Sequence, residues 1–186
     1  MKQNIKDYTV VLENYLPDKL CDEILSQNLD WENGKWYNYA YKGDGSYSLR
    51  GNNHSNSFLE NYDPLTEEHM TSWVKMYKER TGIETLGVVA YTSPKVNRYD
   101  IGHNMDEHVD LIRSIFDGKN KGVPIMSTVT LLNDENEFEG GDLIVSKEKI
   151  PLTKGDMVIF PSTFMYPHLV TPVTKGTRYT LVCWWF

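Results

Sequence analysis

Hydrophobic residues follow a helical spacing only in the first part of the chain. A first helix is expected after Pro17, because three apolar residues recur at three- and four-residue intervals: Leu20, Ile24 and Leu25. Asp63-Pro64 repeats this start signal, and a second helix is expected up to Gly82, with its apolar residues at Leu65, Met70, Trp73, Val74 and Tyr77. The β-branched run 8–13 predicts one short strand ahead of both helices.

From Leu86 onward the pattern changes to short β-type runs separated by glycine-containing turns. The expected strands fall within residues 86–93, 95–99, 125–132, 141–146, 155–160, 168–173 and 178–186. Many short strands at regular spacing are typical of a sandwich or barrel. We therefore expect a single domain over 1–186 that is mostly β with flanking helices. Residues 86–186 would form a jelly-roll core, and residues 1–85 its helix and strand support.

Residues 31–62 are rich in aromatic side chains: Trp31, Trp36, Tyr37, Tyr39, Tyr41, Tyr47, Phe58 and Tyr62. One interpretation is a set of hairpins whose aromatic residues pack on the core, because aromatic residues favour strands. The other is a mobile flap over a binding cleft, in which Trp36, Tyr39 or Arg50 contacts the substrate.

Charge and cysteine content narrow the class of protein further. The formal net charge of −7 disfavours a nucleic-acid partner, which normally requires a basic surface. Cys21 and Cys183 form no disulfide framework, and no apolar run has the length of a membrane span or a secretory signal. We expect a cytoplasmic protein with neither a membrane partner nor a nucleic-acid partner.

The densest group of coordinating side chains lies between Tyr99 and Asp110. His108 and Asp110 are two residues apart, so on a strand they face the same way and could share a divalent metal. His168 is the best placed third ligand, since the remaining histidines lie in a polar loop, on a helix and beside the pair: His54, His69 and His103. Taken alone, the His-x-Asp pair is a weak signal that occurs by chance in many proteins, and a surface ion pair with an unrelated histidine at a strand end explains it more often than a metal site does.

Arg178 adds a second chemical requirement. It lies ten residues after His168 in the last strand, where Arg178, Thr180, Val182 and Trp184 face one way. An arginine inside a barrel requires an anion, and its planar guanidinium fits a carboxylate. A metal with an inward arginine one strand away would hold a dicarboxylic co-substrate, with the far carboxylate on Arg178 and the Thr180 hydroxyl.

Residues 91–186 resemble the Fe(II)/2-oxoglutarate-dependent dioxygenase superfamily, specifically its prolyl 4-hydroxylase-like branch. The family's Tyr-x-x-Gly-x-x-Met-x-x-His-x-Asp pattern is matched by Tyr99, Gly102, Met105, His108 and Asp110. Four further motifs follow in the family's order: Leu132-Asn133; Phe138, Gly140, Gly141 and Leu143; Gly155-Asp156 through Phe160-Pro161-Ser162; and Arg178-Tyr179 with Trp184.

The resemblance implies a double-stranded β-helix that binds Fe(II) through His108, Asp110 and His168. It also implies 2-oxoglutarate and O2 as co-substrates, decarboxylation to succinate, and Tyr99 as a phenol donor at the metal-bound end. This chain departs from the pattern at Leu131, where relatives often have a tyrosine that reaches the far carboxylate. Collagen-type members have lysine at the position of Arg178, so the similarity leans toward compact bacterial, phage and oxygen-sensor-like members.

Three functions are compatible with these residues. The first is a 2-oxoglutarate-dependent hydroxylase of a prolyl or similar residue in a peptide or protein, with Trp184 among its substrate contacts; a free amino acid or other small molecule is the alternative substrate. The second is a cupin-like metal enzyme that uses no 2-oxoacid, in which Arg178 would have no anchoring role. The third is a binding module with a vestigial site.

Overall fold

The computed structural model describes residues 4–33, 37–41, 47–51, 54–59, 62, 64–111 and 122–186, with the backbone alone described at 33, 37–41 and 47–51. The larger of its sheets has seven strands in the order β1-β12-β8-β15-β6-β5-β2. Their bounds in that order are Val10–Leu12, Met157–Pro161, Met126–Leu131, Arg178–Trp185, Lys95–Tyr99, Ser55–Phe58 and Glu32–Asn33. Every pairing in it is antiparallel.

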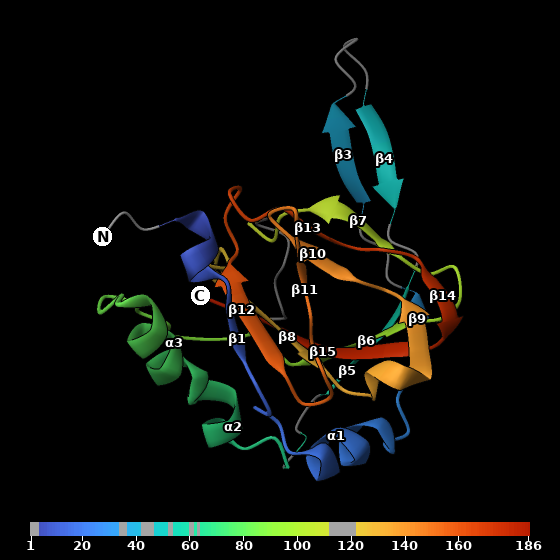
Figure 1. Cartoon of the computed structure of the whole chain (residues 1–186), viewed down its shortest axis with the longest axis horizontal. Coiled ribbons are helices and arrows are strands. Elements are labelled where there is room, and N and C mark those ends of the chain that lie inside the picture. The colour runs from blue at the N-terminus through green and yellow to red at the C-terminus, as the bar shows by residue number, and fades with distance from the viewer. Residues whose placement is uncertain are drawn as a thin grey trace.

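A second, four-stranded antiparallel sheet faces the first (Figure 1). Its order is β11-β10-β13-β7, with bounds Glu148–Ile150, Leu143–Val145, His168–Val170 and Met105–His108. The remaining strands of the described residues form two separate pairs: β9 (Phe138–Gly140) with β14 (Val173–Gly176), and β3 (Tyr37–Tyr41) with β4 (Tyr47–Gly51). The result is a double-stranded β-helix, the mostly β jelly-roll that the strand pattern predicts.

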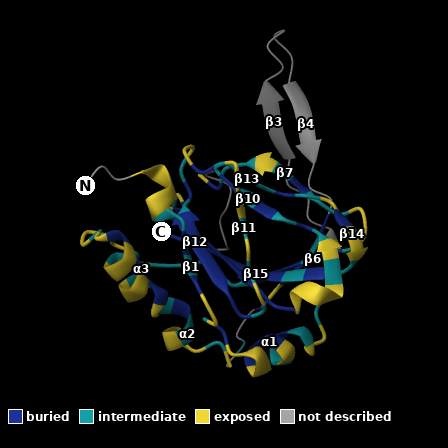
Figure 2. Cartoon of the chain, viewed as in Figure 1, coloured by how far each residue is buried: buried dark blue, intermediate teal, exposed yellow. Residues whose placement is uncertain are grey.

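The helices lie outside the larger sheet, with their exposed sides toward solvent (Figures 1 and 2). They are α1 (Asp18–Leu25), α2 (Glu67–Thr71) and α3 (Trp73–Thr81), with short 3-10 turns at η1 (Ile5–Tyr8) and η2 (Glu135–Glu137). Pro17 lies at the start of α1, and Gly82 ends α3 in the left-handed conformation at φ 72°, as the sequence predicts. Among the helices of the described residues, none combines the length and apolar character needed to cross a bilayer.

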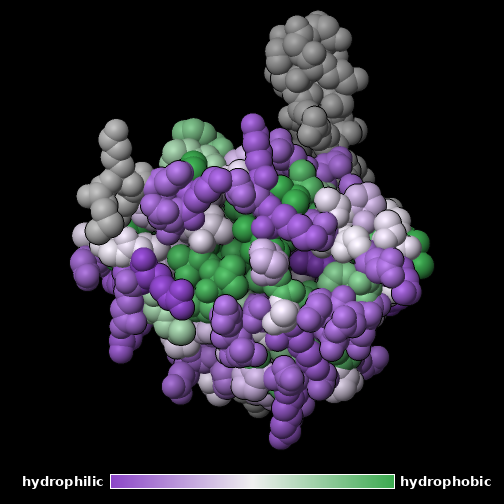
Figure 3. All heavy atoms as spheres, viewed as in Figure 1, coloured by the Kyte–Doolittle hydropathy of each residue, from purple (hydrophilic) through white to green (hydrophobic). Residues whose placement is uncertain are grey.

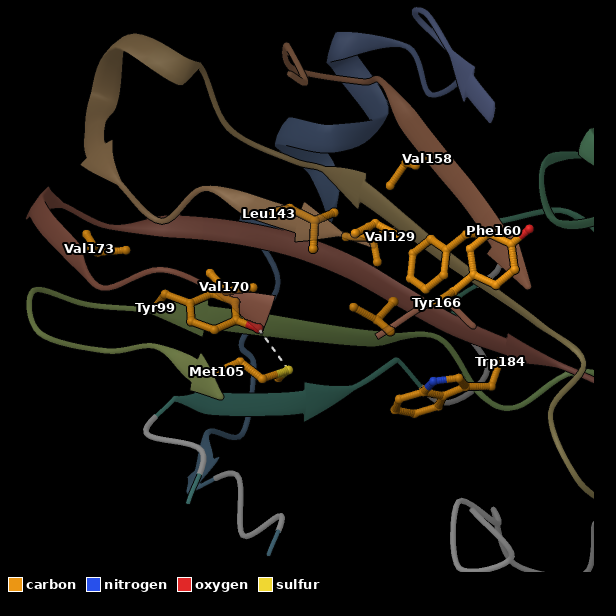
Figure 4. Close-up of a cluster of buried hydrophobic side chains, with 12 residues drawn as sticks. Tyr99, Met105, Val129, Leu143, Val158, Phe160, Tyr166, Val170, Val173 and Trp184 are labelled. Carbon is orange, nitrogen blue, oxygen red and sulfur yellow. Dashed lines mark hydrogen bonds between the residues drawn. The ribbon is translucent and has the colours of Figure 1, made fainter. Parts of the chain in front are cut away.

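Three hydrophobic clusters hold these layers together. One fills the space between the two sheets and includes Tyr99, Met105, Phe160, Tyr166 and Trp184 (Figure 4). The other two join the larger sheet to the helices, through Trp73 and Tyr77 of α3 and through Leu20 and Ile24 of α1. On the face seen in Figure 3, hydrophobic residues gather over β1 and β12, and hydrophilic residues surround them. The site described below therefore lies in a barrel that is packed on both sides of its main sheet.

The second helix is interrupted at Ser72, whereas the sequence predicts one continuous helix. The Tyr15 hydroxyl donates to the His69 carbonyl at 2.6 Å and accepts from the Trp73 amide at 3.2 Å. In an uninterrupted helix this amide and this carbonyl would bond to each other. Tyr15 therefore replaces one helical hydrogen bond, and a side chain 58 residues away determines the break between α2 and α3.

Two strand predictions are also corrected. Residues 86–93 form no strand, and Tyr91 makes only a single bridge to Trp185. Among the described residues, the backbone of this segment bonds only to the last residues of the chain, beyond Val182, where the pairing of β15 with β6 ends. The run 168–173 divides into β13 and β14 around Pro172, which has no amide to donate. The carbonyl of Pro172 instead accepts from Gly141 at 3.2 Å.

Candidate active site

Two histidines and one aspartate meet between the sheets at the β7–β13 pair. His108 on β7 and His168 on β13 are direct cross-strand partners, and their ring centroids are 4.2 Å apart. Asp110 follows β7 by two residues, with its two carboxylate oxygens each 3.4 Å from one histidine Nε2. One ligand atom from each of the three lies within 4.8 Å of the others. Strand pairing thus brings together residues that are 58 to 60 positions apart.

Backbone carbonyls fix the orientation of both imidazoles. Nδ1 of His108 lies 2.8 Å from the Asp106 carbonyl, and Nδ1 of His168 lies 3.2 Å from the Tyr166 carbonyl. A carbonyl only accepts hydrogen bonds, so each Nδ1 carries the proton and each Nε2 is directed at Asp110. This arrangement is typical of histidines that ligate a metal through Nε2.

Asp110 is the buried anion of the group, at 4% exposure. Burial alone would raise the pKa of Asp110, but attraction to His168 and hydrogen bonds from His108 and Ser127 lower it well below the ordinary value. Ser127 donates to Asp110 at 2.6 Å and lies 2.8 Å from Ser162, which closes the Phe-Pro-Ser run. The carboxylate is therefore held ionised and in one orientation.

The two histidines respond oppositely to their surroundings. Burial lowers the pKa of His168 to about 4. Burial also acts to lower the pKa of His108, but its hydrogen bond and attraction to Asp110 outweigh burial and raise it. In the metal-free protein, a proton on His108 is thus the one that balances the carboxylate, and a divalent cation would replace it.

Arg178 lies at the other end of the barrel interior and is 3% exposed. Its Nη1 has no hydrogen-bond partner among the described residues. The glycine at 141 makes room for it, since a Cβ there would come within 2.9 Å of the Arg178 Cδ. A buried guanidinium nitrogen left unpaired in this way indicates a site for an anion.

The side chains around Arg178 form the walls of that site. Tyr99 is its direct partner across β6 and β15, and the guanidinium carbon lies 5.6 Å from the Tyr99 ring centroid. Thr180 follows Arg178 on the same face and is 1% exposed. Leu131 pairs with Thr180 on the other side and contributes no polar atom. Behind Arg178 a cavity of about 610 Å³ lies between β10, β11 and the loops that precede α1 and β12.

Three buried polar residues of the barrel were not predicted from the sequence: His54, Lys95 and Asn97. His54, expected in a polar loop, is 2% exposed and stacks on Tyr99 with ring centroids 5.3 Å apart. Lys95 and Asn97 are each 2% exposed on β6. Because side chains alternate along a strand, Asn97 and Lys95 share a face with the inward Tyr99, and this rule would have predicted that both are buried.

The substrate contacts expected in residues 31–62 are not described. Trp36 lies outside the described residues, and Tyr39 and Arg50 lie on β3 and β4, where only the backbone is described. That hairpin extends beyond β7 (Figure 1). Trp184, the remaining expected contact, is 6% exposed and lies in the barrel interior (Figure 4).

Comparisons with known proteins agree with this geometry. The family model of the 2OG-Fe(II) oxygenase superfamily matches residues 94–186, the second half of the chain. A PKHD-type hydroxylase of Methylobacterium nodulans is 33% identical over 96 residues, which are 49% of this chain and 41% of that relative. The chain thus matches less than half the length of this curated relative.

Solved structures extend the likeness of fold to nearly the whole chain. A viral collagen prolyl hydroxylase from Paramecium Bursaria Chlorella virus-1 aligns with a TM-score of 0.66 at 16% identity, covering 95% of this chain and 94% of that one. A prolyl hydroxylase from Trichoplax adhaerens aligns with a TM-score of 0.66 at 17% identity, covering 97% and 84%. The motifs, the fold and the family model agree, and the chain belongs to the 2OG-Fe(II) oxygenase superfamily.

Proposed function

We propose that this chain is an Fe(II)- and 2-oxoglutarate-dependent hydroxylase. The proposal rests on two groups that lie in the same barrel interior and that each need a ligand. One is the buried His-Asp-His group, and the other is a buried arginine whose Nη1 has no partner among the described residues. A metal alone would account for the first requirement and leave Arg178 unexplained. A dicarboxylic co-substrate that reaches from the metal to Arg178 accounts for both.

The three ligands fit Fe(II). Two imidazole nitrogens and one carboxylate on one side of an ion leave three positions open, the arrangement of non-haem iron oxygenases. Once a metal has displaced the proton from His108, Nε2 of His108, Nε2 of His168 and the carboxylate of Asp110 are three acceptors that converge on one place. Such a set is favourable only when a cation lies among them.

The opposite end of the interior fits the far carboxylate of 2-oxoglutarate. We assign Arg178 as its main anchor, with the Thr180 hydroxyl beside it, and Tyr99 as the phenol donor toward the metal-bound end. The apolar Leu131 removes one hydrogen bond that relatives often supply, so this co-substrate site depends more heavily on Arg178.

When bound, iron and 2-oxoglutarate supply the oxidation itself. One oxygen atom of O2 enters a C–H bond of the substrate and becomes its hydroxyl, the other enters succinate, and 2-oxoglutarate loses CO2. The protein contributes positioning: Ser127 and two backbone carbonyls hold the ligands, and Arg178 fixes the co-substrate. The hydrophobic cluster around the site excludes water from it.

A prolyl-type residue of a peptide is the substrate class that the comparisons support. The two solved structures named above are prolyl hydroxylases, and the Trichoplax enzyme is in complex with a hypoxia inducible factor peptide fragment. A free amino acid or other small molecule is the alternative that the sequence leaves open.

Mass spectrometry of candidate substrates tests the proposal, together with a measurement of succinate. We expect a product heavier by one oxygen atom, in amounts equal to the succinate formed above the substrate-free background. A product that forms without 2-oxoglutarate would contradict the proposed function.

A further inference from the structure

A cavity of about 610 Å³ adjoins Arg178 at the end of the barrel interior away from the metal ligands. Leu131 of the larger sheet and Leu143 of the smaller sheet line it, and each is at most 3% exposed, so the cavity begins between the sheets. On β10, Val145 is the partner of His168, and the cavity starts two residues farther from the metal ligands, at Leu143. The space next to the arginine is therefore open on the side that the metal ligands do not occupy.

The guanidinium of Arg178 is restrained only weakly by its described neighbours. Its Nη1 has no hydrogen-bond partner among the described residues, and its carbon lies 5.6 Å from the centroid of the Tyr99 ring. A contact with a ring face restrains a guanidinium less than a bidentate carboxylate does. Along the cavity wall, Gly141 has no side chain and Leu131 has no polar atom. The position of the guanidinium can therefore adjust to the ligand that it meets.

The cavity also offers the guanidinium a favourable place to which it can withdraw. Asp142 lies on the cavity wall and pairs with Lys149 at 2.8 Å. Burial lowers the pKa of Arg178, and attraction to Tyr99 and to Asp142 opposes this. A carboxylate has several acceptor positions, so Asp142 can meet a second cation besides Lys149. Movement into the cavity thus brings the guanidinium closer to an acid, and its charge stays matched.

We infer that Arg178 is a movable anchor and that the site accepts, as co-substrate, a 2-oxo dicarboxylic acid one methylene group longer than 2-oxoglutarate. The inference rests on the proposed function and deepens it, because it concerns the co-substrate of the same site. A methylene group is about the size of a water molecule, which occupies about 30 Å³, so the displacement it requires fills only a small part of the cavity. In turnover the longer acid would lose CO2 and take up one oxygen atom of O2 to become glutarate, and the other oxygen atom would enter the substrate.

Calorimetry of the Zn(II)-loaded full chain with 2-oxoadipate and with 2-oxoglutarate tests the inference. In a site of fixed length, one extra methylene group weakens binding roughly 10- to 200-fold. A movable anchor predicts a Kd for 2-oxoadipate within tenfold of the Kd for 2-oxoglutarate, and a larger difference would overturn the inference. 2-Oxohexanoate has as many carbon atoms as 2-oxoadipate but no far carboxylate, so we expect it to bind more than tenfold more weakly. Equal binding of these two acids would also overturn the inference, because Arg178 would then not hold the longer acid.

Two variants that fill the cavity test whether the arginine moves into it. In Leu131→Phe we expect 2-oxoadipate to lose at least ten times more affinity than 2-oxoglutarate, because the larger ring occupies the space into which Arg178 withdraws. Leu152→Phe narrows the cavity from its less buried wall and should act in the same direction, even if Leu131→Phe does not fold. Met76→Phe, at a 40% exposed position of α3, is the matched control and should leave both affinities unchanged. If neither cavity variant weakens 2-oxoadipate more than 2-oxoglutarate, the inference is overturned.

The order of the measurements separates this inference from the proposed function. The binding of Zn(II) and then of 2-oxoglutarate to the wild-type chain is measured first. Failure at that step contradicts the proposed function, and the inference falls with it. Normal binding of 2-oxoglutarate together with weak binding of 2-oxoadipate contradicts the inference alone.

Discussion

Arg178 is buried at a cost that only a bound anion offsets. Its Nη1 lacks a partner among the described residues, and burial lowers the pKa of the guanidinium. Removal of such a side chain should weaken co-substrate binding without unfolding the protein, because no described hydrogen bond to that nitrogen is lost. This separates a binding role from a structural one.

We therefore expect Arg178→Ala to raise the KM for 2-oxoglutarate by roughly 10- to 100-fold, since a hydrogen bond to a charged group contributes about 1.5–3 kcal/mol. Lys175→Ala is the matched control, because Lys175 is an exposed cation that pairs with Glu139 at 2.8 Å. Steady-state kinetics of succinate formation provide the measurement. An equal rise in KM for both variants would show that Arg178 is not the anchor.

His54 makes stability depend on pH. Its pKa is lowered from an ordinary value of 6.5 to about 3, so the unfolded chain binds a proton there that the folded chain does not. The contribution of neutral His54 to the free energy of unfolding is fully present above pH 6.5 and is lost as the pH falls toward 3. For the metal-free protein we expect the contribution of His54 to fall by about 2 kcal/mol between pH 7 and pH 5.

Urea unfolding at these two pH values measures the effect in the wild type and in His54→Leu. The variant should lose less stability on acidification, while the contribution of His168, which has the same sign, remains in both proteins. Identical pH dependence in the two proteins would mean that His54 is not buried as the structure has it.

At the scale of elements, the alternation of side chains along a strand predicts which residues of β15 and β6 are buried. On β15 it placed Arg178, Thr180, Val182 and Trp184 on one face, and all four are buried. The same rule applied to β6 would have placed Lys95 and Asn97 beside Tyr99. It could not have found His54, which precedes β5 in a polar segment and is buried through contact with Tyr99.

Helix boundaries depended on a contact that no local pattern contains. Spacing and Gly82 predicted the extent of the α2–α3 region, but the interruption at Ser72 arises from Tyr15. The strand predicted over 86–93 does not form for a related reason. Its apolar residues favour a strand, but only the last few residues of β15 are available to pair with it. In both cases distant packing outweighed local propensity.

Tyr15→Phe should lower the free energy of unfolding by about 1–3 kcal/mol, because it leaves the Trp73 amide and the His69 carbonyl without their shared partner. In Tyr91→Phe, the lost bond to Glu67 is 3.3 Å long and exposed, so we expect a change within about 0.5 kcal/mol. Denaturant unfolding monitored by circular dichroism compares them. A neutral effect of Tyr15→Phe would contradict the account of the helix break.

For the molecule as a whole, the two sheets explain why ligands distant in sequence meet. The sequence motifs predicted which residues would meet, and pairing of β7 with β13 brings His108 and His168 into register. What the sequence could not predict is the depth of the site: the burial of Lys95 and the cavity behind Arg178 depend on how the sheets close.

The central claim is that the His108–Asp110–His168 group binds the iron that drives 2-oxoglutarate turnover. The most direct test measures the release of labelled CO2 from 1-¹³C-2-oxoglutarate by the purified chain with and without Fe(II), which requires no knowledge of the substrate. We predict iron-dependent release by the wild type and its loss, together with bound iron, in His108→Ala and Asp110→Asn. Undiminished release by either variant, or release by the wild type without iron, would contradict the account.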